Sequence, residues 1–165
     1  DYLTLGKKSL SEQMKFLAVQ VVREEGLTQV MNKSVIGISS EATVGVWYTA
    51  EYSFGYELKP ERYDIVKTDT GIEVQLDRPI LVATPAIKSL RHKILSGGVL
   101  TDEKTAVIKI YEGAAKRVKA QGLAMASEEA VVALCEKKLV AFLHDFLAKQ
   151  PGVKVVPTIV VSYKT

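Results

Sequence analysis

The chain has 165 residues, of which 47% are hydrophobic and 25% are charged, and its formal net charge at pH 7 is +3. A chain of this length and composition buries enough apolar surface to fold as a single domain over residues 1–165 without a metal or a disulfide. The single cysteine excludes an intramolecular disulfide and a cysteine-based zinc site, and the small net charge does not by itself indicate nucleic acid.

The N-terminal segment has the spacing of a helix. Ser9 is a candidate N-cap, and Glu12 falls in the first turn. Apolar residues then recur three or four positions apart, at Leu10, Met14, Leu17 and Val21. We expect this helix to end at Gly26, or to continue through a kink toward Asn32.

A long strand is the clearest element that the sequence predicts. Every even position from Ala42 to Leu58 is apolar or aromatic, whereas most odd positions are Thr, Gly, Ser or Glu. Because side chains alternate between the two faces of a strand, residues 42–58 are expected to form one strand with one buried face. Its length suggests a bend, for which Gly45 and Gly55 are the candidate positions.

The middle of the chain predicts a hairpin and then a connection. Alternating apolar residues at 62–68 and 72–76 flank the turn sequence Asp69-Thr70-Gly71. A brief strand is expected over residues 80–83. Residues 86–101 have only weak strand character, so we expect them to connect the sheet to the helices that follow.

Helical periodicity returns after residue 102. A first apolar stripe is formed by Val107, Ile110, Tyr111, Ala114 and Val118, and a second by Val132, Cys135, Leu139, Phe142 and Phe146. Ser127 between them marks either a new N-cap or a kink in one long helix. Pro151-Gly152 ends the helical region. Residues 153–163 return to strand character, and Pro157 favours an edge position or a bulge for this strand.

This order of elements predicts an α+β fold. We expect a twisted, mainly antiparallel sheet with helices packed on one face, ending in a long helix followed by a C-terminal strand.

Several local strings resemble the bacterial family catalogued as domain of unknown function 4230. The resemblance covers most of the chain and is carried by Leu3–Leu5, Tyr52–Leu58, Tyr63-Asp64-Ile65, Ile72–Ile80, Gln121-Gly122-Leu123 and the valine-rich final strand. Asp77 departs from the family's pattern, in which proline is common. The resemblance implies an extracytoplasmic domain, often behind an N-terminal membrane anchor. It implies no established activity, so no catalytic residues are transferred.

Two features are candidate binding surfaces. Trp47 falls on the polar face of the predicted long strand, where it forms either a contact surface or a site covered by the N-terminal helix. Lys116 and Lys119 share a helix face and Arg117 lies beside them, a cluster that suits the phosphate of an anionic lipid or of a nucleic acid. No aromatic stacking pattern and no nucleic-acid motif accompany the cluster, so a solvated helix face is its simplest interpretation and nucleic acid is not expected.

Two further hypotheses remain open. His144-Asp145 resembles part of the metal site of a hydrolase, but that chemistry needs more ligands, and the only other histidine is His92. Tyr48, Tyr52 and Tyr56 either line a groove for a small ligand or pack in the core of the sheet. Cys135 lies on an apolar stripe, so we expect it to be buried and unreactive.

The sequence therefore favours a non-enzymatic binding or scaffolding module. We expect it in the cell envelope, on the extracytoplasmic face, anchored by a segment upstream of Asp1. A membrane surface or another envelope protein is the expected partner, and no cofactor is expected. The metal-dependent hydrolase and the small-ligand binder are the alternatives.

Overall fold

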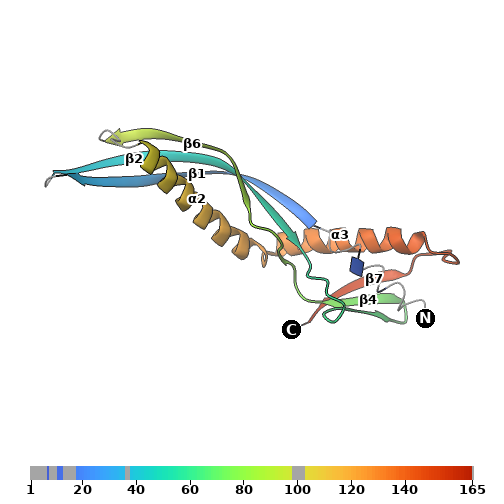
Figure 1. Cartoon of the computed structure of the whole chain (residues 1–165). Coiled ribbons are helices and arrows are strands. Elements are labelled where there is room, and N and C mark those ends of the chain that lie inside the picture. Colours follow the sequence, from blue (N-terminus) through green and yellow to red (C-terminus); the bar gives the residue numbers. More distant parts are fainter. Residues whose placement is uncertain (1–6, 8–10, 13–17, 36–37, 98–102, 165) are drawn as a thin grey trace. The chain divides into compact units, whose positions relative to one another are not determined.

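The computed structural model describes residues 7, 11–12, 18–35, 38–97 and 103–164. Within these ranges it has the predicted α+β class: long strands dominate the first two thirds, two helices follow, and a strand comes after the last helix (Figure 1).

The chain divides into two compact units, each built from segments that are separated in the sequence. Unit 1 comprises Asp1–Gln20, Ser53–Ala83 and Leu123–Thr165, and unit 2 comprises Val21–Tyr52 and Thr84–Gly122. Unit 2 is therefore formed by two stretches that interrupt unit 1. The two units are described separately below.

Unit 2 is a layer of long strands with a helix along one face. β2 (Ile38–Gly55) is paired with β1 (Ala18–Val35) on one side and with β6 (Ala86–Gly97) on the other, and the β2–β6 pairing is antiparallel (Figure 1). Most of α2 (Glu103–Met125) belongs to this unit.

The alternation predicted for β2 is confirmed. Its even-numbered residues from Ala42 to Tyr52 are all at most 3% exposed. They form the core of unit 2 together with a buried stripe on α2 made of Ile110, Ala114 and Val118. The strand ends at Gly55, three residues earlier than expected, although Tyr56 and Leu58 are still buried.

The prediction of an N-terminal helix is wrong from residue 18 onward, because residues 18–35 form β1. Part of the expected helix, residues 9–10 and 13–17, lies outside the described residues. The helical spacing that ends at Val21 does not continue, because side chains in β1 alternate between half-buried odd positions and exposed even positions from Val19 to Val30, with the exposed Arg23 as the exception. Pairing with β2 decides the conformation of this segment, and such pairing routinely overrides weak local preferences.

The connection expected over residues 86–101 is also wrong, because residues 86–97 form β6. The pairing of β6 with β2 is irregular between Thr43 and Val44 and again between Trp47 and Thr49. At the second irregularity Ser89 has a φ of 55°, which is uncommon for a residue other than glycine. These bulges break the period of two by which a strand is recognised in a sequence.

Unit 1 contains a three-stranded sheet in the order β3 (Asp64–Lys67), β4 (Gly71–Leu76), β7 (Thr158–Tyr163). β3 and β4 form the predicted antiparallel hairpin. β7 starts directly after Pro157, and it lies at the edge of the sheet, parallel to β4. The short β5 (Ile80–Leu81) pairs with the last residues of β2.

The helix α3 (Glu129–Ala148) packs against β7, and the break after α2 confirms a new helix start near Ser127. Its buried stripe differs from the predicted one, since it consists of Val131, Cys135, Leu139, Leu143 and Leu147. Because one turn takes about 3.6 residues, this four-residue spacing makes the stripe wind gradually around the helix. Phe142 and Phe146 lie beside it and are half-buried.

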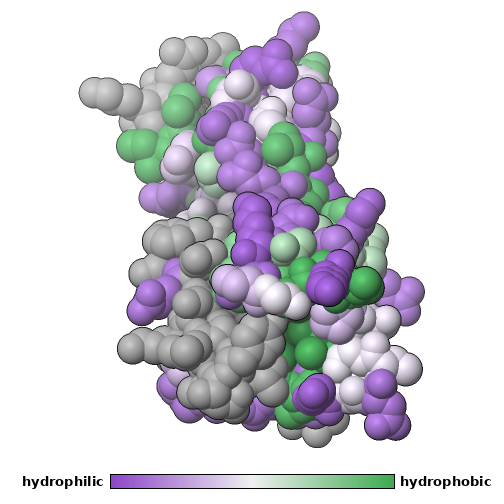
Figure 2. Space-filling view, turned by 90° about the vertical axis from the view of Figure 1, so that its right-hand side faces the viewer, coloured by the Kyte–Doolittle hydropathy of each residue, from purple (hydrophilic) through white to green (hydrophobic). Residues whose placement is uncertain are grey.

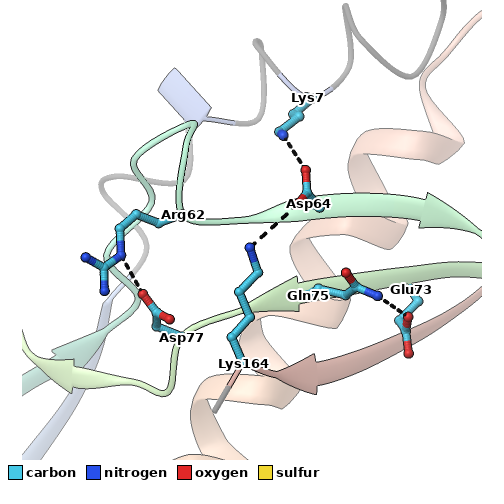
Figure 3. Close-up of polar contacts among 7 residues, drawn as sticks. All are labelled: Lys7, Arg62, Asp64, Glu73, Gln75, Asp77 and Lys164. Carbon is cyan, nitrogen blue, oxygen red and sulfur yellow. Dashed lines mark hydrogen bonds and ion pairs between the residues drawn. The ribbon is translucent and has the colours of Figure 1, made fainter.

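Polar contacts join the N-terminal segment of unit 1 to β3 and its neighbourhood. The Lys7 ammonium lies 2.7 Å from a carboxylate oxygen of Asp64, and the Tyr63 hydroxyl donates a hydrogen bond of 2.6 Å to the Lys7 carbonyl. Lys164, which follows β7, lies 3.6 Å from the other oxygen of Asp64 (Figure 3). Asp64 therefore bridges the start of the described chain to its end.

Candidate functional site

The four residues predicted to bind a partner, Trp47, Lys116, Arg117 and Lys119, all fall in unit 2. This unit also carries the whole net charge of the chain. It contains 10 Lys and Arg against 7 Asp and Glu, whereas unit 1 contains 12 of each kind. An anionic partner is therefore attracted to unit 2 rather than to unit 1.

Trp47 lies on the face of the unit 2 sheet that points away from the buried side of β2, and it is 40% exposed. Its indole ring lies across two glycines: a Cβ on Gly26 of β1 would come within 3.2 Å of the ring, and one on Gly45 within 2.6 Å. The absence of side chains at these positions lets the ring lie flat on the sheet. The part of the expected N-terminal helix that reaches residue 18 and beyond forms β1 instead, so residues 18–35 do not cover Trp47 as a helix.

Cations flank Trp47 on β6. Arg91 is the direct partner of Trp47, and Lys93 is the partner of Gly45, so both side chains share its face of the sheet. Lys88 on the same strand forms an ion pair with Glu51 of β2 at 3.0 Å. This face is therefore a mixed surface of one aromatic ring, cations and scattered apolar residues.

The three basic residues predicted to cluster on α2 lie on two different sides of the helix. Lys116 and Lys119 line an open groove of about 490 Å³ between α2 and the start of β6. The other residues of the groove are Thr84, Pro85, Ala86, Ile87, Tyr111 and Ala115. Arg117 faces the other side of α2, toward β1. The sequence thus predicted the proximity of the two lysines, but not the opposite wall of the groove.

The groove side of α2 is amphipathic in its own right. Ile108, Tyr111, Ala115 and Lys119 are spaced by three or four residues, so they share one helix face. Ile108 is 55% exposed and Tyr111 is 51% exposed, which is unusual for large apolar side chains. This face offers apolar contact and an aromatic hydroxyl next to two ammonium groups. Figure 2 shows that, on the side of the molecule it presents, the exposed apolar areas are small and interrupted by hydrophilic residues.

The tyrosines of the predicted ladder are core residues. Tyr48 is 2% exposed and Tyr52 is fully buried, and the Tyr52 hydroxyl donates a hydrogen bond of 3.1 Å to the Gln121 side chain of α2. Burial raises the pKa of both hydroxyls, and the nearby Glu25 carboxylate raises them further. These rings pack in the core between the sheet and α2, which is the second of the two roles that the sequence left open for them.

Tyr56 belongs to unit 1, where its hydroxyl lies 3.0 Å from that of Tyr163 on β7. Burial is the main cause that raises the pKa of Tyr56 to about 12.

Arg78 stacks over the Tyr163 ring, with its guanidinium carbon 5.1 Å from the ring centroid. Arg78 also lines a small cavity of about 160 Å³ with the acidic residues Glu129 and Glu136. The sequence analysis did not find this cluster, because its members come from three separate elements.

His144 and Asp145 do not gather a metal site among the described residues. Both side chains are exposed, and His144 Nδ1 lies 3.8 Å from the nearer Asp145 oxygen. Across the parts of the chain that the structure describes, no three His, Cys, Asp or Glu side chains cluster as metal ligands. The hydrolase hypothesis therefore gains no support from the geometry, and metal analysis of the purified protein remains its test.

Cys135 is buried, as its place on the apolar stripe predicted. Burial raises the pKa of its thiol, so the reactive thiolate is disfavoured at neutral pH.

Comparisons with protein-family models, curated proteins and solved structures found no match to this chain. Among the described residues, no helix is both long and apolar enough to cross a membrane.

Proposed function

We propose that the protein is a non-enzymatic binding module of the cell envelope, and that unit 2 binds the surface of membranes that contain anionic lipids. The observation that carries this proposal is the groove beside α2, where Lys116 and Lys119 stand next to exposed apolar side chains and the Tyr111 ring. Lipid head groups offer a phosphate to such lysines, while tyrosine and isoleucine suit the boundary between head groups and acyl chains.

Charge and area together indicate the strength of this binding. A lysine near an anionic membrane contributes about 1 kcal/mol, so two lysines contribute roughly a factor of ten to thirty in affinity. The apolar face of α2 adds a contribution that does not depend on salt. Moderate, reversible binding is therefore expected, and its electrostatic part weakens as ionic strength rises.

Co-sedimentation with vesicles tests the proposal. We expect binding to vesicles of phosphatidylglycerol and phosphatidylcholine, weaker binding as salt increases, and little binding to phosphatidylcholine alone. The double variant Lys116→Gln/Lys119→Gln should bind about tenfold more weakly. As a matched control, Lys137→Gln/Lys154→Gln removes two exposed lysines from unit 1. Equal losses in the two variants would show that only net charge matters, and would refute a site at the groove.

The envelope location has a separate basis and a separate test. It depends on the resemblance to the family of domain of unknown function 4230, and no observation in the fold bears on it. The gene sequence upstream of Asp1 tests it: a hydrophobic segment encoded there would support an extracytoplasmic, anchored domain, and a cytoplasmic partner domain would contradict it.

A further inference from the structure

β1 is much longer than an average strand, and one of its two edges is open. It has 18 residues, whereas strands in globular proteins have about five or six on average. Among the strands that the structure describes, β1 pairs only with β2, so no described strand bonds to the backbone groups along its other edge. An edge of this kind is a template on which another strand can pair.

The two outer strands of the unit 2 sheet differ in how well they suit such pairing. β6 has two irregularities in its pairing with β2, and Ser89 at one of them has a φ of 55°. Bulges bend a strand and turn its edge away from a neighbour. In β1, by contrast, every even position from Gln20 to Val30 is exposed, so no bulge shifts the alternation along this stretch. The edge of β1 is therefore the regular one.

Two exposed valines on β1 lie symmetrically about Gly26. Val22 is 57% exposed and Val30 is 54% exposed, and each lies four residues from Gly26. A Cβ on Gly26 would point at the Trp47 ring, so all three positions face the same side of the sheet as Trp47. One exposed valine is ordinary. Two at equal distances from one residue form a pattern that a two-fold axis through that residue maps onto itself.

Such an axis, perpendicular to the sheet, would place Val22 of one copy opposite Val30 of the other, at two points. It keeps each face of the sheet on the same side, so it must pass through a residue and not between two residues. No like charges meet in this register. The opposing pairs between the valines and Gly26 are Arg23 with Gln29, Glu24 with Thr28, and Glu25 with Leu27.

The neighbouring registers are less favourable. An axis through Arg23, Glu24 or Glu25 would place that side chain directly opposite its own copy, and like charges in this position destabilise a sheet. An axis through Leu27 would place Val30 opposite Glu24. The three consecutive charges thus exclude the registers on one side of Gly26, and the valines favour Gly26 over Leu27.

We propose that two copies of this chain associate through the open edge of β1, antiparallel, about a two-fold axis at Gly26. The two unit 2 sheets then join into one sheet, with the two β1 strands at its centre. Backbone hydrogen bonds between the edges supply affinity, and the two valine pairs set the register. The surface is separate from the groove beside α2, which is lined by α2 and by residues 84–87.

Sedimentation equilibrium tests the association, and we expect a reversible dimer. Val22→Lys/Val30→Lys places lysine opposite lysine at two points and should weaken the dimer by about ten- to a hundredfold. Val22→Glu/Val30→Lys places glutamate opposite lysine at the same points and should recover an affinity within about tenfold of the natural chain. As a matched control, Val82→Lys/Val155→Lys changes two exposed valines of unit 1 and should leave the association unchanged.

Cysteine cross-linking tests the register. Directly opposite residues of an antiparallel pair have Cα atoms about 4.5–5.5 Å apart, which a disulfide can span. The two copies of position 22 would instead lie about 27 Å apart along the strands. A mixture of Val22→Cys and Val30→Cys should therefore oxidise to a cross-linked dimer, and neither variant alone should do so. The natural Cys135 is buried and does not interfere.

The proposal is overturned if the natural chain stays monomeric at millimolar concentration, or if the Lys/Lys and Glu/Lys variants associate equally. It is also overturned if either cysteine variant alone cross-links as readily as the mixture. Both valines are exposed, so the variants should fold, which circular dichroism checks. Lys116→Gln/Lys119→Gln should dimerise like the natural chain, so failure of the dimer and failure of the lipid groove give different results.

Discussion

The two units use polar groups in different ways. In unit 1, polar side chains pair with one another: Lys7 with Asp64, Arg62 with Asp77, and Tyr56 with Tyr163 (Figure 3). Its positive and negative charges are equal in number. In unit 2, the net charge is +3, and open hollows lie on both sides of α2. The polar groups of unit 1 are balanced and paired, whereas unit 2 carries the excess positive charge on which the proposed membrane binding depends.

Glycine substitutions give the largest contrast between the units. A Cβ on Gly71 would overlap the backbone of Thr158 in the parallel β4–β7 pairing, so Gly71→Ala should lower the free energy of unfolding by at least about 4 kcal/mol. Gly113→Ala in α2 of unit 2 should instead raise it by about 1 kcal/mol, because alanine favours the helix. Urea denaturation measures both. Similar effects of the two substitutions would contradict the difference in packing.

A core truncation tests how strongly α3 supports unit 1. Leu139 is fully buried on the stripe that faces the sheet, so Leu139→Ala should cost about 3 kcal/mol of unfolding free energy. Leu134 lies on the same helix but is 48% exposed, and Leu134→Ala should cost less than about 1 kcal/mol. The urea concentration at the midpoint of unfolding, measured for both variants, gives the two losses of stability. A large effect at Leu134 would indicate that a partner or a segment outside the described residues covers it.

The tyrosine pair of unit 1 predicts a loss of stability in alkali. The folded pKa of Tyr56 is raised from 10.0 to about 12, so the native state holds this proton more tightly than the unfolded chain does. The resulting stability is complete below pH 10 and is lost as the pH rises to about 12, a change of roughly 3 kcal/mol. Between pH 10 and 12, the free energy of unfolding should fall less steeply for Tyr56→Phe than for the natural chain. Tyr111→Phe, which changes an exposed ring, should behave like the natural chain.

The position of Trp47 in unit 2 predicts a spectroscopic change. Since Trp47 is the only tryptophan, the fluorescence of the chain reports its environment. Gly45→Ala would place a Cβ 2.6 Å from the indole ring and should displace the ring into water, with a red shift in emission and about 1 kcal/mol of lost stability. Unchanged emission would show that the ring does not lie across Gly45.

The smallest effect is expected from the exposed carboxylate of unit 1. The hydrogen bond and charge of Lys7 lower the pKa of Asp64 below 3.8, so this contact stabilises the native state above pH 3.8 and is lost as the pH falls through the lower folded value. Asp64→Asn should slightly lower the melting temperature at pH 7 and not at pH 2. Asp69→Asn, in the neighbouring turn, should show no such pH dependence.

The parts of the fold that were predicted correctly are those with a local signal. The alternation in β2, the turn before Gly71 and the break at Ser127 are each set by residues next to one another in the sequence. β1 and β6 lack such a signal. The half-buried residues of β1 include Glu25 and Gln29, whose polarity hides the alternation, and the bulge around Ser89 interrupts that of β6. Pairing with β2 decides both conformations, and pairing is not visible in a single segment.

The candidate sites follow the same rule. Helical spacing correctly placed Lys116 and Lys119 together. It did not show that Arg117 faces a different strand, because the positions of β1 and β6 on the two sides of α2 are known only from the fold. The hollow on the other side of α2 is lined by residues of β1, β2 and α2, so no motif in the sequence points to it.

The parallel pairing of β4 with β7 has a consequence for synthesis. The hairpin β3–β4 leaves the ribosome more than 80 residues before its neighbour, and the second segment of unit 2, Thr84–Gly122, is translated in between together with α3. Until residues 158–163 emerge, the inner edge of β4 has unsatisfied backbone groups open to any passing strand. We therefore expect a chain that stops after α3 to aggregate through this edge, and an added peptide with the sequence of β7 to restore its solubility.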